Sequence, residues 1–124
     1  MICFGHENLK VSNLDDSIRF YEENFGMTVR KRLEAGDGKR MAWMALDNTS
    51  GFFLELTEDT VVLGNNHIAF VTDERDVYYS KHCSAGLIDT EIKDLGIYFM
   101  HDLDGNSIEV MPLSAVVILG GAEK

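Results

Sequence analysis

Two histidines and two glutamates occupy matching places in the two halves of this chain. His6 and His67 each open a strand-like run, and Glu55 and Glu109 each lie inside an apolar run. An ionised carboxylate in apolar surroundings is costly without a cation, and a divalent metal removes that cost. Two imidazoles and two carboxylates suit nickel, cobalt, zinc, iron or manganese, with positions left for water and substrate. Together the four residues predict a metal site.

Taken singly, each of these residues has an ordinary structural interpretation. A lone histidine at a strand start is usually a surface or capping group, and a lone glutamate in a strand often lies on the solvated face. The agreement between the halves favours the metal interpretation, because a repeat places equivalent residues in equivalent positions.

Other reactive residues are better explained by structure. His82 and Cys83 are neighbours on a predicted helix, where adjacent side chains do not face each other, so we expect a surface histidine and a core cysteine. His101 is interpreted as a polar residue flanking a turn. Trp43 and Phe53 fit either a pocket wall or plain core.

The elements that position the four residues follow from the sequence pattern. In the first half, residues 6–11 alternate as a strand, with His6, Asn8 and Lys10 on one face. Ser12 or Asn13 suits the N-cap of a helix that ends at Gly26. Three more strands are predicted, at residues 27–33, 40–46 and 51–57.

The second half repeats this order. We predict a strand at 67–72, a helix from about 73 to 84 that ends before Gly86, and strands near 89–93, 96–101 and 107–111. The predicted fold class is therefore α+β, with two βαβββ modules covering about 1–60 and 61–124. Because no low-complexity linker divides them, we expect a single domain over residues 1–124, with the metal in a sheet-lined cavity.

Composition and charge disfavour several classes of function. The 124 residues are 45% hydrophobic, which suffices for one domain. Acidic residues outnumber basic ones by 21 to 11, giving a net charge of -10, so a nucleic-acid partner is not expected. The two cysteines, Cys3 and Cys83, have no CxxC spacing, and no signal peptide or membrane span is visible. We expect a cytoplasmic protein with no membrane partner.

Five blocks of the sequence resemble glyoxalase I (lactoylglutathione lyase), a branch of the vicinal oxygen chelate superfamily. They are residues 6–11 (HENLKV), 15–27 (DDSIRFYEENFGM), 53–57 (FLELT), 67–70 (HIAF) and 102–109 (DLDGNSIE). The set His6, Glu55, His67 and Glu109 is the specific part of this resemblance. Related extradiol dioxygenases and fosfomycin-modifying enzymes typically use two histidines and one glutamate, so Glu55 favours the glyoxalase branch.

The resemblance implies an activity and a cofactor. The reaction would be the metal-dependent isomerisation of a hemithioacetal, formed from methylglyoxal and a thiol, into a 2-hydroxyacyl thioester through an enediolate. It implies one divalent ion per site, nickel or cobalt in preference to zinc, with Glu109 as the base and Glu55 as its pseudo-symmetric counterpart. It also implies a homodimer, in which the ligands come from one chain or from two.

The thiol-binding positions depart from this resemblance. Enzymes that use glutathione typically carry arginine, asparagine and arginine where this chain has Lys10, Asp59 and Leu63. Lysine keeps the charge but loses the two-pronged hydrogen bond, Asp59 repels a carboxylate, and Leu63 has no charge. Lys10 and Asp59 are thus the candidate substrate-binding residues, and a thiol other than glutathione stays open.

Two other interpretations stay open as well. The chain resembles extradiol dioxygenases and thiol transferases, which would use His6, His67 and Glu109 and leave Glu55 as a bystander. It also resembles metal-free proteins of the superfamily that sequester drugs between paired modules. Metal content separates the second from an enzyme, and removal of the Glu55 carboxylate tests the first.

Overall fold

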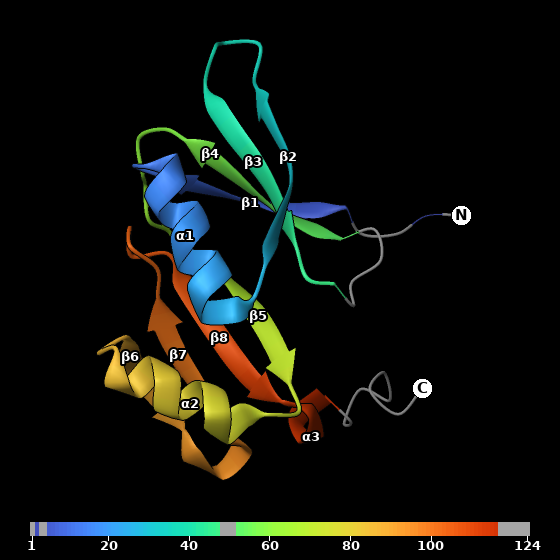
Figure 1. Cartoon of the computed structure of the whole chain (residues 1–124). Coiled ribbons are helices and arrows are strands. Elements are labelled where there is room, and N and C mark those ends of the chain that lie inside the picture. The colour runs from blue at the N-terminus through green and yellow to red at the C-terminus, as the bar shows by residue number, and fades with distance from the viewer. Residues whose placement is uncertain (1, 3–4, 48–51, 117–124) are drawn as a thin grey trace. The chain divides into compact units, whose positions relative to one another are not determined.

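The computed structural model describes residues 2, 5–47 and 52–116 of the chain. The chain divides into two compact units, Met1–Leu63 and Gly64–Lys124, and each contains a four-stranded mixed sheet and a principal helix (Figure 1). Cys3 lies outside the described residues. Among the helices that are described, none is long and apolar enough to cross a membrane.

The first unit has the order β-α-β-β-β. Its strand order is β1-β4-β3-β2, with β1 parallel to β4 and the other neighbours antiparallel. The elements are β1 (His6–Val11), α1 (Leu14–Phe25), β2 (Thr28–Glu34), β3 (Arg40–Ala45) and β4 (Phe53–Glu58).

Helix α1 covers one face of this sheet and leaves the other face to the predicted ligands. Asn13 caps the helix by accepting a hydrogen bond from the Asp16 backbone N–H, and Gly26 ends it with φ of 68°. The helix packs on β3 and β4, where Leu54 and Leu56 are buried. Because side chains alternate along β4, Glu55 points to the opposite face.

The second unit repeats this arrangement in the order β5-β8-β7-β6. Two short elements were not predicted, a 3₁₀ turn and a C-terminal helical turn, because single turns leave no periodic pattern in a sequence. The elements are β5 (His67–Thr72), α2 (Arg75–Ser84), β6 (Ile88–Ile92), η1 (Lys93–Leu95), β7 (Ile97–His101), β8 (Ser107–Pro112) and α3 (Leu113–Val116).

The predicted fold class, α+β with two βαβββ modules, is confirmed. The two sheets also agree in an irregularity: the β2–β3 register shifts between Val29 and Lys31, and the β6–β7 register shifts between Ile88 and Thr90. A bulge at the same place in both units supports the internal duplication.

The interpretation of His82 and Cys83 was wrong. His82 is fully buried and shares a hydrogen bond of 2.8 Å with the Tyr98 hydroxyl, whereas the Cys83 thiol is free and its residue exposed. A buried polar group needs a partner, and Tyr98, on the neighbouring sheet, supplies it. Sequence alone does not show that partner, because β7 lies far along the chain from α2.

Candidate metal centre

In the first unit, the pairing of β1 with β4 brings a histidine and a glutamate together. His6 lies opposite Phe53 in the parallel register, and Glu55 lies two residues further along, opposite Asn8. The two side chains share a face, and His6 Nε2 is 3.3 Å from Glu55 Oε1. The strand pairing thus brings together two of the four predicted ligands from the two ends of the unit.

The second unit builds the same pair from β5 and β8. His67 lies opposite Ser107, and Glu109 lies two residues further along, opposite Ala69. His67 Nε2 is 3.0 Å from Glu109 Oε1. Exposure matches as well: the histidine side chains are 41% and 44% exposed and the glutamates 13% and 14%. The two units therefore present equivalent pairs.

The donor atoms of each pair fit neighbouring ligands of one ion. Metal bonds to imidazole nitrogen and carboxylate oxygen are about 2.1 Å long, so adjacent ligand atoms lie about 3.0 Å apart at right angles and about 3.4 Å apart in a tetrahedron. The separations of 3.3 and 3.0 Å lie within this range. The separation of 3.0 Å between His67 and Glu109 is also that of a hydrogen bond, so this pair can hold its geometry before an ion binds.

The structure brings the four predicted ligands together as two pairs, one in each unit. Among the described residues, no three histidine, cysteine, aspartate or glutamate side chains form a candidate metal-binding group. The complete set of His6, Glu55, His67 and Glu109 therefore stays a prediction, as do the catalytic roles assigned to the two glutamates.

Glu55 also has hydrogen-bond donors that the sequence interpretation missed. Asn8 Nδ2 donates to its Oε1 at 3.0 Å and Trp43 Nε1 donates to its Oε2 at 2.9 Å. The alternation of β1 correctly predicts the strand face of Asn8, but nothing in the pattern indicates its partner. The link to Trp43 depends on the β3–β4 register, which sequence periodicity does not fix.

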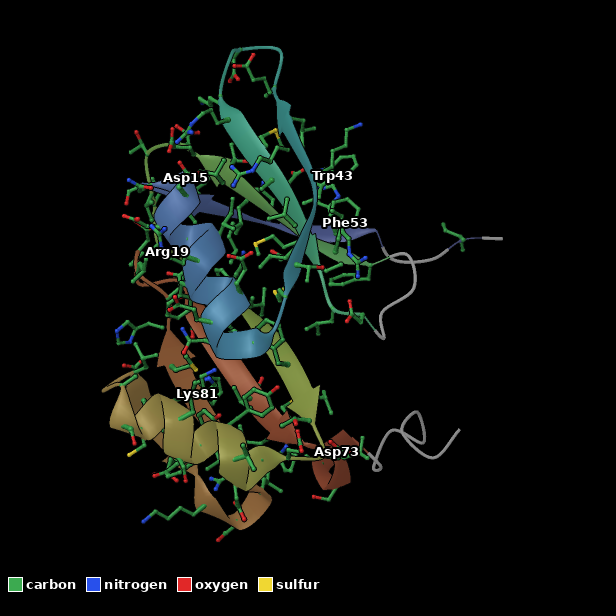
Figure 2. The ribbon with its side chains drawn as sticks, viewed as in Figure 1. Asp15, Arg19, Trp43, Phe53, Asp73 and Lys81 are labelled. Atoms are coloured by element: carbon green, nitrogen blue, oxygen red, sulfur yellow. The ribbon has the colours of Figure 1, made fainter. Side chains whose placement is uncertain are left out.

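Aromatic rings flank both histidines. In the first unit the Phe53 ring lies 5.0 Å from the His6 ring and 4.7 Å from the Trp43 ring, centroid to centroid. Figure 2 shows Trp43 and Phe53 on the side of this sheet away from α1. In the second unit Phe99 meets His67 edge to face at 5.7 Å. Each histidine therefore has an aromatic neighbour on one side, while its own side chain stays partly exposed.

The candidate substrate-binding residues lie further along the same edge of the first sheet. Lys10 is opposite Thr57, and Asp59 follows β4 directly. Asp59 Oδ2 accepts a hydrogen bond of 2.8 Å from Lys39 Nζ, which holds the pKa of Asp59 below its usual value, with a smaller contribution from the charge of Lys10. The Asp59 charge is thus partly offset, a feature that the sequence did not predict. Leu63 is exposed.

His101 takes the structural role expected of it. Its Nδ1 lies 2.8 Å from Asp89 Oδ1, at the end of β7 beside the hairpin. That hairpin is organised by Asp102, which is buried and accepts hydrogen bonds from the backbone N–H groups of Asp104 and Asn106. These residues shape a turn, and none of them was assigned to the site.

Solved structures of two glyoxalase I enzymes are similar to this chain. The trypanothione-dependent glyoxalase I of Leishmania major is 25% identical, with a TM-score of 0.75 over 95% of this chain and 90% of that one. A mutant of glyoxalase I from Zea mays is 28% identical, with a TM-score of 0.69 over 86% of this chain and 43% of that one.

A more distant structure shares the fold. A mutant of the fosfomycin resistance protein FosX from Listeria monocytogenes, solved with Mn(II), is 18% identical, with a TM-score of 0.74 over 90% of this chain and 93% of that one. A comparison with curated protein sequences found no match.

The sequence itself matches a protein-family model along most of its length. The match covers residues 4–110, which include both His and Glu pairs, and the family is described as the Glyoxalase/Bleomycin resistance protein/Dioxygenase superfamily. The duplicated βαβββ units and the matching pairs agree with that assignment. The chain therefore belongs to this superfamily, also called the vicinal oxygen chelate superfamily.

Proposed function

We propose that this protein is a metal-dependent isomerase of the glyoxalase I type. The observation that carries the proposal is the equivalence of the two pairs: His6 with Glu55 and His67 with Glu109 occupy the same register positions in their units. Two glutamates, each largely buried beside a histidine, suit a four-ligand ion better than a three-ligand one. The similarity to two glyoxalase I structures supports the same branch.

The metal would be held by His6, Glu55, His67 and Glu109. Nickel or cobalt is proposed in preference to zinc, since the compact form of the chain resembles the enzymes that use them. A bound divalent ion would act as a Lewis acid that makes the carbon proton of the substrate easier to remove. Each histidine would bind it through Nε2, the ring nitrogen that faces its glutamate.

The protein's own contribution to the chemistry is proton transfer by a carboxylate. The substrate is a small molecule, the hemithioacetal of methylglyoxal and a thiol. Glu109 takes the proton from the carbon that bears the sulfur and returns it to the neighbouring carbon, while the hydroxyl proton passes from the oxygen of the first carbon to that of the second, which gives a 2-hydroxyacyl thioester. The aromatic rings beside the pairs would limit the access of water to the intermediate from that side.

Lys10 and Asp59 are proposed to contact the thiol. Lys10 shares the face of His6 and Asn8 on β1, so it can meet a carboxylate on the substrate. Asp59, which is paired with Lys39, would favour a thiol that has fewer carboxylates than glutathione. It would also favour a thiol with a cationic group at the end that lies near Asp59. The Leishmania relative is trypanothione-dependent, which makes trypanothione a probe to test beside glutathione.

The test is an isomerisation assay on untagged protein loaded separately with nickel, cobalt or zinc. Methylglyoxal is supplied with glutathione, trypanothione or a small monothiol, and thioester formation is followed by ultraviolet absorbance. Turnover that depends on metal and on one thiol supports the proposal. A protein that binds one ion per chain but turns over none of these hemithioacetals would remove the glyoxalase assignment and keep the metal site.

The same preparation tests the remaining parts of the proposal. A homodimer in the cytoplasm is proposed, and light scattering during gel filtration should give twice the mass of the 13.9 kDa chain.

Glu55→Gln separates the four-ligand proposal from a three-ligand dioxygenase or thiol transferase. An enzyme that keeps its metal affinity without the Glu55 carboxylate would belong to the three-ligand type.

A further inference from the structure

The two glutamates lie in cross-strand rows that correspond residue by residue. In the first unit, Trp43 and Asn8 flank Glu55 from β3 and β1. In the second unit, Phe99 and Ala69 flank Glu109 from β7 and β5. The bulges that set the β2 and β6 registers also correspond, so the positions compared are equivalent.

The two rows differ in the number of hydrogen-bond donors that they offer to the carboxylate. Trp43 and Asn8 each donate a hydrogen bond to Glu55, one to each carboxylate oxygen. Phenylalanine and alanine, at the equivalent positions in the second unit, have no side-chain donor. Among the described residues, the side chain that forms a hydrogen bond with the Glu109 carboxylate is that of His67.

Asn8 is itself held in one orientation. Its amide nitrogen carries two N–H bonds, and Nδ2 donates both to Glu55 at 3.0 Å and to Thr57 Oγ1 at 2.9 Å. Thr57 is buried, 4% exposed, so this second contact is protected from water. The indole of Trp43 is fixed in turn by the Phe53 ring.

We propose that Asn8 and Trp43 are positioning residues that hold Glu55 as a fixed metal ligand and leave Glu109 as the carboxylate free to move during proton transfer. This inference rests on the metal site of the proposed function. A carboxylate with a donor on each oxygen is restricted in rotation, whereas one bound through a single contact can turn. Donors to a ligating carboxylate of this kind typically contribute about 10–100-fold to metal affinity.

The spectroscopic test uses the fact that Trp43 is the one tryptophan in the chain. In a nitrogen–proton correlation spectrum of the metal-free protein, its indole N–H gives a single side-chain signal. Glu55→Gln should move that signal, because the hydrogen bond from Nε1 loses its charged acceptor. Glu109→Gln should leave it in place. An indole signal that does not respond to Glu55→Gln would overturn the inference, whatever the enzyme catalyses.

The metal test uses substitutions that the fold already accommodates in its other half. Asn8→Ala and Trp43→Phe install the residues found at the equivalent positions of the second unit. Each should weaken nickel or cobalt binding about ten-fold or more in a competition titration with a chromophoric chelator. Tyr79→Phe is the matched control, because it removes a donor to Glu91, which is not a proposed ligand. It should change metal affinity less than about two-fold.

The outcomes separate this inference from the proposed function. In one outcome the wild type binds the metal, and Asn8→Ala and Trp43→Phe, shown by thermal melting to be folded, bind it with unchanged affinity. That result would overturn the inference and keep the metal site. No binding by the wild type would overturn both. Weakened binding in these variants would support the inference even where no thiol gives turnover.

Discussion

At the scale of single residues, the central feature is that equivalent glutamates have unequal surroundings. Glu55 receives hydrogen bonds from Asn8 and Trp43, whereas Glu109 lies beside His67 with Ala69 and Phe99 at the equivalent positions. A four-ligand site of two similar halves would be chemically symmetric if only the ligands mattered. We propose that these neighbouring residues give the two carboxylates different tasks, metal binding for Glu55 and proton transfer for Glu109.

Removal of each carboxylate should therefore have different kinetic effects. Glu109→Gln is expected to lower kcat by about 10²–10⁴-fold, the usual contribution of a general base. Glu55→Gln is expected to weaken metal binding first, with part of the activity recovered at high metal concentration. Steady-state kinetics over a series of metal concentrations separates the two. Equal loss of kcat at saturating metal in both variants would contradict the division of roles.

The choice of thiol should respond to the charge at Asp59. Asp59→Asn removes the negative charge that Lys39 now offsets, so the positive charges of Lys39 and Lys10 are less compensated at this place. The value of kcat/KM with glutathione should then rise about two- to ten-fold, with little change for a small uncharged thiol. A parallel change for both thiols would show that Asp59 does not contact the thiol end.

At the scale of elements, the first sheet and α1 are joined by one glutamate. Glu58, at the end of β4, accepts a hydrogen bond of 2.9 Å from the Leu14 backbone N–H at the start of α1. Arg40 of β3 donates to both of its oxygens, at 3.1 and 2.7 Å. The Arg40 hydrogen bonds, followed by that of Leu14, lower the pKa of Glu58 to about 2.

This depressed pKa predicts a pH dependence of stability. A carboxyl whose pKa is lower in the folded state stabilises the fold above its unfolded value, here 4.5, and loses that contribution as the pH falls towards 2. Glu58→Gln should lower the melting temperature at pH 7 and show a smaller further decrease between pH 4.5 and 2. Glu34→Gln, at the end of β2, is the control, since the structure describes no ion pair for Glu34. Parallel pH profiles of Glu58→Gln and the wild type would contradict the role of Glu58.

The end of α1 gives a second test at this scale. Gly26 has φ of 68°, and a Cβ there would meet no atom within 4 Å, so its substitution costs backbone strain alone. Gly26→Ala should destabilise the fold by about 1 kcal/mol, as the strain exceeds the gain from a less flexible unfolded chain. Gly36→Ala, with equal space and no positive φ, should be neutral or slightly stabilising in the same denaturant titration. Equal changes in the free energy of unfolding for the two variants would contradict the backbone strain proposed at position 26.

How far the sequence predicted these elements depends on the kind of signal. β1 and β5 were predicted with their observed bounds, because short alternating runs begin at His6 and His67 and end at turn residues. The four candidate ligands were chosen from the repeat, and their binding of a metal stays a prediction. The contacts of Glu55 with Trp43 and of Asp59 with Lys39 did not, because they depend on strand register and on side-chain reach across a sheet.

At the scale of the whole molecule, each half is small for a stable domain. A unit of about 60 residues buries a modest fraction of its surface, and here each has one principal helix for a four-stranded sheet. The face of each sheet that carries the His and Glu pair holds aromatic and partly buried side chains. We therefore propose that the two modules unfold together as a single cooperative domain.

Scanning calorimetry tests that proposal. The wild type should unfold in one transition, with the calorimetric enthalpy equal to the van't Hoff enthalpy. Added nickel or cobalt should raise the transition temperature of the whole protein, because an ion that draws ligands from both modules stabilises both. Two separate transitions, with metal shifting one of them, would show independent modules.

The most direct test of the account is the metal content of the wild type and of four single variants, His6→Ala, Glu55→Gln, His67→Ala and Glu109→Gln. Untagged protein is loaded with nickel or cobalt, washed and measured by mass spectrometry beside a His101→Ala control. A four-ligand site predicts one ion per chain in the wild type and the control, and less bound metal in all four variants. A wild type that holds no ion, or an ion lost from only one pair's variants, would contradict it.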